Sequence, residues 1–136
     1  MSVIYFDNNA TTSVAEEVFE AMRPYLTDFY GNPSSMHTFG GQVGTEVDRA
    51  RQSAAGLLGC DPEEIVFTSG GTESDNAAVR GVLEAESERN KIVTSRVEHP
   101  AVLTVCRHLE KSGCELSETG VDGDGRLNME QLEDEV

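Results

Sequence analysis

The feature that most constrains the fold is the alternation of two kinds of apolar pattern along the chain. Short β-rich runs occupy residues 64–69, 91–95 and 114–119. Between and around them, apolar residues recur every three or four positions, which predicts helices at residues 14–26, 42–58, 72–88, 100–111 and 128–136. This alternation predicts an α/β fold, a three-layer arrangement in which helices cover a parallel or mixed sheet.

Length and charge limit the class of protein. The 136 residues suit one domain with a modest core. The net charge of -15, from 25 acidic and 10 basic residues, repels nucleic acid and anionic membranes, so we expect neither as a partner. Such a surface suits a salt-rich cytoplasm, and it also occurs in ordinary acidic proteins. No run approaches the ~20 apolar residues of a membrane span, and the N-terminus lacks a secretory signal, so we expect a cytoplasmic protein.

Several residues are expected to begin or end helices. Ser13 and Glu16 have the spacing of a capping box, and Gly59 suits a helix end. Pro100 suits the first turn of a helix. The last helix begins near Asn128 and is followed by neither a cap nor a strand. We therefore expect an interrupted domain, with a frayed terminal helix as the alternative.

The first candidate site is the turn at residues 69–72, between the run 64–69 and the next helix. Its two glycines let the backbone approach a ligand, and the helix start offers free amides and a partial positive charge. Thr72 adds a hydroxyl donor, whereas the acid Glu73 would compete with a bound phosphate. The GxxxxGK[ST] and GxGxxG patterns of nucleotide-binding loops are absent. These residues alone leave two interpretations open, an anion site and a plain strand-to-helix turn.

The second candidate is His99, which follows the run 91–95 and precedes Pro100 at a helix start. An imidazole in this place can stack on a flat ring or exchange protons. The alternative is a surface histidine packed on its own loop. Because α/β sheets bind ligands at the carboxyl ends of their strands, we expect His99 and the turn 69–72 to lie together.

The cysteines and acids do not predict a metal site or a disulfide. Cys60, Cys106 and Cys114 are odd in number, show no CxxC spacing and have no histidine at zinc-ligand spacing. Disulfides are not expected in a chain without an export signal, and the first two cysteines are expected to be core thiols. Residues 122–133 resemble a calcium loop, but a cation stands at one ligand position and a bulky residue at the glycine position. We predict a simple turn there.

Four segments, in this order, resemble the N-terminal part of the NifS/IscS-type cysteine desulfurases. They are YFDNNATT, YGNPSSMHTFG, EIVFTSGGTESDN and VTSRVEHPAVL, and the resemblance covers Val3 to Glu133. It implies a class V aminotransferase with part of a fold-type I large domain. Residues 1–14 would form an arm that contributes to the small domain. Residues 15–136 would form the first part of the cofactor-binding large domain, truncated before completion.

The resemblance also implies an activity. Such an enzyme is a homodimer that uses pyridoxal 5′-phosphate, takes sulfur from L-cysteine, leaves alanine, and passes persulfide sulfur to a scaffold or acceptor protein for iron–sulfur cluster assembly. Gly71 and Thr72 match the pair that binds the cofactor phosphate. His99 matches the histidine that stacks on the pyridine ring and helps proton transfer.

One departure from the family affects this expectation. The family's cofactor-anchoring lysine, its ring-pairing aspartate and its sulfur-accepting cysteine lie beyond Val136, and neither Lys91 nor Lys111 matches the anchor. We therefore expect the isolated chain to be inactive. Two alternatives stay open: another lyase or aminotransferase of the same group, such as a selenocysteine lyase, and a non-catalytic phosphate-binding or dimerisation module.

Overall fold

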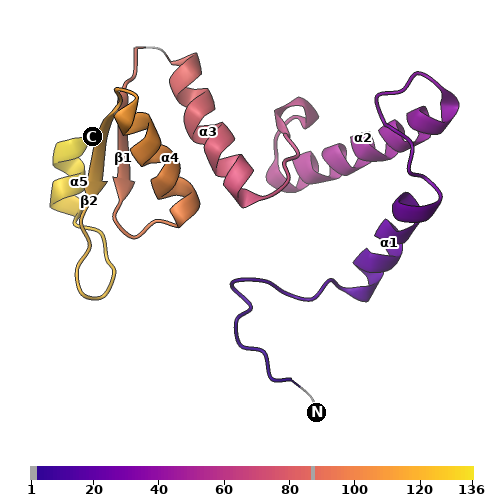
Figure 1. Ribbon diagram of the computed structural model, residues 1–136, viewed down its shortest axis with the longest axis horizontal. Coiled ribbons are helices and arrows are strands. Elements are labelled where there is room, and N and C mark those ends of the chain that lie inside the picture. The colour runs from indigo at the N-terminus through magenta and orange to yellow at the C-terminus, as the bar shows by residue number, and fades with distance from the viewer. Residues whose placement is uncertain (1–2, 87) are drawn as a thin grey trace. The chain divides into compact units, whose positions relative to one another are not determined.

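The computed structural model describes residues 3–86 and 88–136 (Figure 1). The chain divides into two compact units, Met1–Val66 and Phe67–Val136. The second unit contains a parallel sheet with helices packed on it, which confirms the predicted α/β class. None of the helices in the described residues is long and apolar enough to cross a membrane.

The first unit is helical. An arm without helix or strand, which contains a turn at residues 7–11, leads into α1 (Glu16–Thr27). This helix continues through Pro24, and α2 (Thr38–Leu58) is followed by the 3-10 turn η1 (Pro62–Glu64). Gly59 ends α2 in the left-handed conformation at φ 73°, as predicted, and donates its N–H to the Ala55 carbonyl at 2.8 Å. The Arg51 guanidinium donates to the Ile65 carbonyl and so ties α2 to the residue after η1.

The predicted capping box at the start of α1 is wrong. The helix begins at Glu16 with Ala15 at the N-cap position and no side-chain cap. A hydroxyl caps a helix from the N-cap position itself, where it reaches the amides of the first turn, and Ser13 lies two residues before that position. By contrast, α2 is capped by a residue that the sequence did not suggest, because His37 Nδ1 accepts from the Gly40 N–H at 3.2 Å.

The loop before α2 packs tightly on that helix. Gly40 is buried, and a Cβ built on it would meet the Asn32 carbonyl oxygen and the Ser35 Cβ, the latter at 2.7 Å. The Tyr30 ring stands edge-on to Phe39 with centroids 5.2 Å apart. The GNPSS segment is therefore held against the start of α2 by close backbone approach.

The second unit is built around a β–α–β crossover. It contains α3 (Gly71–Ala85), β1 (Lys91–Ser95), α4 (Pro100–Lys111), β2 (Glu115–Thr119) and α5 (Met129–Glu135). The two strands are parallel, with Ile92 opposite Leu116 and Ser95 opposite Thr119. The bounds of β1 and α4 are those predicted, and Asn128 caps α5 by accepting from the Gln131 N–H at 3.0 Å.

The run 64–69 was predicted as a strand, and this is wrong. Residues 65–68 have no regular secondary structure and join no sheet in the described part of the chain, which contains a two-stranded sheet. A β-rich composition becomes a strand only when a neighbouring strand takes up its backbone hydrogen bonds. Val66 is accordingly 77% exposed.

The core of the second unit lies under α4. Ala101, Val105 and Cys106 are buried, and Ser95 and Thr119 are buried at the ends of the paired strands. Both hydroxyls are satisfied, since Ser95 donates to Glu98 and Thr119 donates to Glu135, each at 2.8 Å. Cys106 is the core thiol that was predicted.

Cys60 was also expected to be a core thiol, and this is only partly correct, because the thiol is half-buried. Cys60 directly follows the αL glycine that ends α2, where the chain turns away from the helix. Residues 122–126 form the predicted turn, in which Asp122 Oδ1 accepts from the Asp124 and Arg126 amides at 2.9 Å each. The described residues contain no cluster of side chains arranged to hold a metal ion.

Candidate functional site

The start of α3 exposes a row of backbone amides. Gly70 is the N-cap residue, and Gly71 and Thr72 are the first two residues of the helix. The earliest bond inside the helix runs from the Ser74 N–H to the Gly70 carbonyl at 3.1 Å, so the amides before it have no partner within the helix. A Cβ built on Gly70 or Gly71 meets no atom within 4 Å. The amides are therefore open to a ligand.

The turn before α3 is fixed by side chains on both sides of the glycine pair. Glu73 Oε2 accepts from the Ser69 N–H at 2.7 Å and from Ser69 Oγ at 2.5 Å. These hydrogen bonds, the one from the hydroxyl first, hold the pKa of the Glu73 carboxyl below its usual value of 4.5. Thr68 Oγ1 and Ser74 Oγ also share a hydrogen bond of 2.6 Å.

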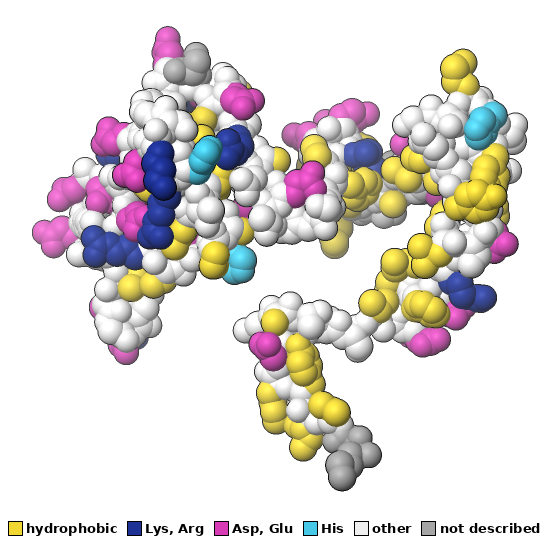
Figure 2. Space-filling view, viewed as in Figure 1, with side chains coloured by type: hydrophobic (Ala, Val, Ile, Leu, Met, Phe, Trp, Pro, Cys, Tyr) yellow, Lys and Arg dark blue, Asp and Glu magenta, His cyan; other side chains and the backbone are white. Residues whose placement is uncertain are grey.

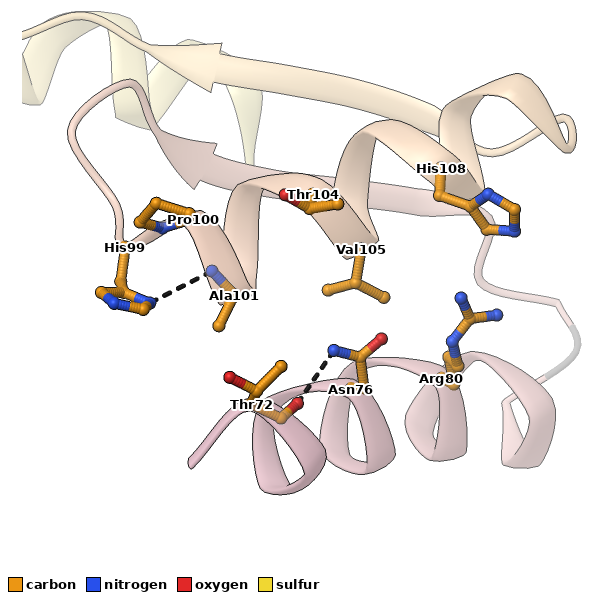
Figure 3. Close-up of a pocket in the computed structure, with 9 residues that line it drawn as sticks. All are labelled: Thr72, Asn76, Arg80, His99, Pro100, Ala101, Thr104, Val105 and His108. Carbon is orange, nitrogen blue, oxygen red and sulfur yellow. Dashed lines mark hydrogen bonds between the residues drawn. The ribbon is translucent and has the colours of Figure 1, made fainter. Parts of the chain in front are cut away.

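His99 occupies the N-cap position of α4. Its Nδ1 accepts from the Ala101 N–H at 3.1 Å, and this nitrogen therefore carries no proton (Figure 3). In the neutral ring the proton is on Nε2, which is left to interact with a ligand. The β1 strand ends at Ser95, and the Ser95–Glu98 hydrogen bond closes the loop that leads to His99.

A groove of about 520 Å³ runs between α3 and α4 and joins the two candidate segments (Figure 3). Thr72 and His99 both line it, whereas Gly71 does not belong to its lining. The two lie together, as the sequence suggested, but only His99 follows a strand. What brings Thr72 beside it is the packing of α3 against α4.

Sequence reasoning missed several polar residues of the groove. Asn76, Arg80, Thr104 and His108 also line it. Asn76 Nδ2 donates to the Thr72 carbonyl at 2.9 Å. The available signal was the spacing of four between Thr72, Asn76 and Arg80, which places them on one face of a helix.

The chemistry of the groove suits an anion. Its described lining includes Arg80, His99 and His108 and contains no Asp or Glu, although the whole chain carries a net charge of -15. The free amides of α3 and the Thr72 hydroxyl add neutral donors at one end. Helix amides and hydroxyls of this kind bind phosphate groups without a lysine.

The sequence was compared with known families and proteins. The model of the aminotransferase class-V family matches residues 4–136. A cysteine desulfurase from Trichormus azollae is 60% identical over 133 residues, which are 98% of this chain and 33% of that protein. The cysteine desulfurase NifS from Azotobacter vinelandii is 49% identical over 131 residues, again 33% of its length. The chain thus spans about one third of the length of these curated relatives.

Solved structures give the same result. A NifS-like protein superposes with a TM-score of 0.91 at 40% identity, covering 98% of this chain and 37% of that one. The apo structure of a cysteine desulfurase from Thermococcus onnurineus NA1 superposes with a TM-score of 0.84 at 31% identity, covering 98% and 34% respectively. The similarity therefore extends over nearly the whole of this chain.

Proposed function

Because this chain belongs to the aminotransferase class-V family, we propose that it supplies the phosphate-binding part of a pyridoxal-phosphate-dependent cysteine desulfurase. Class V aminotransferases and cysteine desulfurases are in general enzymes of this cofactor. The observation that carries the proposal is the groove in which Thr72, at the open start of α3, lies across from His99, with no carboxylate among the described lining residues.

The donors of the groove and of the adjoining start of α3 fit the cofactor. The Gly71 and Thr72 amides and the Thr72 hydroxyl would hold the phosphate, and the His99 imidazole would stack on the pyridine ring. When bound, pyridoxal phosphate withdraws electrons from the α-carbon of the substrate. Since His99 Nδ1 is occupied by the Ala101 N–H, His99 exchanges protons through Nε2. Asn76 keeps the Thr72 carbonyl engaged and so steadies the first turn of α3.

The proposal extends to the whole enzyme. Its substrate is L-cysteine, its products are alanine and a persulfide whose sulfur passes to a scaffold or acceptor protein for iron–sulfur cluster assembly, and it works as a cytoplasmic homodimer. Residues 1–14 serve as an arm of the small domain, and residues 15–136 as the first part of the large domain. The 136 residues alone do not turn over cysteine, since none of their lysines matches the cofactor anchor of the family.

The first test is a titration of the purified chain. Pyridoxal phosphate should raise the melting temperature and give a saturable absorbance change, because a ligand that binds the folded state stabilises it. Thr72→Ala should weaken this binding about tenfold, the effect of losing one hydrogen bond to a charged group, and Thr72→Ser should retain it. Stabilisation by ATP alone would refute the cofactor assignment.

The second test addresses the reaction. Residues 1–136 would replace the matching third of the Trichormus azollae enzyme, and alanine release from L-cysteine would be measured. The chimera should be active, and the same chimera with His99→Ala should turn over at least about tenfold more slowly while retaining the cofactor absorbance. A cofactor-loaded chimera that releases alanine from other amino acids but not from cysteine would exclude the desulfurase.

A further inference from the structure

An acidic side chain lies next to the proposed phosphate site. Glu73 is the third residue of α3, one position after Thr72. A free carboxylate there would repel a phosphate and compete for the same amides. The structure shows where this carboxylate goes: it turns back to Ser69 and is not among the residues that line the groove.

The segment that Glu73 contacts needs an external constraint. Gly70 and Gly71 have no side chains, and glycine loses more conformational freedom on ordering than any other residue. Glu73 Oε2 bridges over this pair to the Ser69 N–H at 2.7 Å and to Ser69 Oγ at 2.5 Å. Such charge-assisted bonds are stronger than neutral ones. The same two bonds lower the pKa of the carboxyl.

We propose that Glu73 is a positioning residue for the cofactor phosphate. Its carboxylate closes the turn between Ser69 and α3, so that the amides of Gly71 and Thr72 are already ordered when the phosphate arrives. This role rests on the proposed function of the groove. In the bound state the same hydrogen bonds keep the Glu73 carboxylate turned toward Ser69 and away from the phosphate.

The test compares two substitutions that change charge equally. Glu73→Gln removes the charge but keeps an oxygen that accepts from Ser69, whereas Glu73→Ala removes both. Losing a negative charge alone favours an anion, so weaker binding by Glu73→Ala cannot come from charge. We expect Glu73→Ala to bind pyridoxal phosphate and inorganic phosphate about tenfold more weakly and Glu73→Gln to bind within about twofold of the unaltered chain. Glu84→Ala, on the same helix, is the matched control and should leave both affinities unchanged.

Two further measurements distinguish a loosened turn from a general loss of stability. Amide exchange at Gly71 and Thr72 should accelerate in Glu73→Ala and be restored in Glu73→Gln, which a loss of overall stability would not do selectively. If Glu73→Ala does not fold, Ser69→Ala removes one of the two bonds and should weaken binding about threefold.

Two outcomes distinguish failure of the proposed cofactor site from failure of the proposed role of Glu73. If the unaltered chain binds neither pyridoxal phosphate nor inorganic phosphate, the cofactor site is refuted and this role with it. If the unaltered chain binds and Glu73→Ala binds equally well, or if Glu73→Gln is as weak as Glu73→Ala, only the role of Glu73 is overturned.

Discussion

At the scale of single residues, burial decides the behaviour of the cysteines. Cys106 is 1% exposed, whereas Cys60 and Cys114 are half-buried. Burial raises the pKa of the Cys106 thiol, and the nearby carboxylates Glu118 and Glu98 raise it further. Because the thiolate is the reactive form, both effects reduce its reactivity.

We therefore predict that a maleimide at mildly alkaline pH modifies Cys60 and Cys114 well before Cys106. Mass spectrometry of peptides from the labelled chain would measure the three rates. Adding denaturant should make the rates equal, which serves as the control. Labelling of Cys106 as fast as Cys60 in the native chain would contradict the buried position.

A second residue-scale prediction concerns the ion pair between α4 and β2. Arg107 donates to both Glu118 oxygens, at 2.7 and 3.0 Å, and this bond lowers the pKa of Glu118 below its ordinary 4.5 and raises that of Arg107. A carboxyl with a lower pKa in the folded state stabilises the fold above its ordinary pKa. That contribution is lost as the pH falls from 4.5 through the folded-state value.

We expect Glu118→Gln to lower the melting temperature slightly at pH 7, because the pair is partly exposed and water screens it. The difference from the unaltered chain should shrink as the pH is lowered below about 4. Glu133→Gln, on the exposed side of α5, is the charge-matched control. An equal effect of Glu118→Gln at both pH values would mean that packing, and not the ion pair, is responsible.

At the scale of elements, two neighbouring glycines at the start of α2 have opposite roles. A Cβ on Gly40 would meet Asn32 and Ser35 at distances that real Cβ atoms do not show, while a Cβ on Gly41 meets nothing within 4 Å. Gly40→Ala should therefore destabilise the chain by about 1–3 kcal/mol through overpacking. Gly41→Ala should be neutral or stabilise it by about 0.5–1 kcal/mol. Urea unfolding measures both, and equal effects would contradict the close approach of the loop.

Secondary-structure elements were predicted correctly where a few neighbouring residues determine the local conformation. The β-branched run 91–95 and Pro100 at a helix start fixed the bounds of β1 and the beginning of α4. Prediction failed where the outcome depends on distant partners. The run 64–69 needs a neighbouring strand. Ser13 failed for a local reason, since a hydroxyl caps a helix only from the residue directly before it and α1 begins at Glu16.

The residues of the candidate site also divide into those that the local sequence reveals and those that depend on packing. Thr72 and His99 could be recognised because each lies at a helix start within a distinctive segment. The spacing of four places Arg80 on the helix face of Thr72, but His108 could not be recognised, because nothing in either helix alone shows that α3 and α4 pack against each other and form a groove.

At the scale of the whole molecule, the first unit leaves an apolar surface uncovered. The α1 helix has no buried residue, and Val18 and Leu26 on its apolar face are 50% and 71% exposed. Hydrophobic side chains also extend along the N-terminal arm (Figure 2). An apolar stripe of this kind on a helix is typical of a surface that packs against something else.

We predict that the isolated chain binds the dye ANS and associates with itself at high concentration. Replacing Val18, Met22 and Leu26 by serine or glutamine should reduce both without loss of the second unit, whose core lies elsewhere. Dye fluorescence and sedimentation velocity measure the two effects. Replacing Glu17 and Glu20, on the polar face, by glutamine is the control. Unchanged dye binding after the apolar replacements would exclude this face as the source.

The two outer edges of the sheet formed by β1 and β2 are places where another chain segment could add as a strand. In the described part of the chain each strand has one neighbour, so both are edge strands whose outward backbone groups pair with no further strand. A third strand laid against the outer edge of β1 would gain about 0.5–1.5 kcal/mol for each backbone hydrogen bond it forms, whereas at the outer edge of β2 it would first displace Arg96 from the Glu118 carbonyl. The crossover is thus a template whose two strands are already ordered in register, so a strand that joins it pays only the entropy of ordering its own backbone.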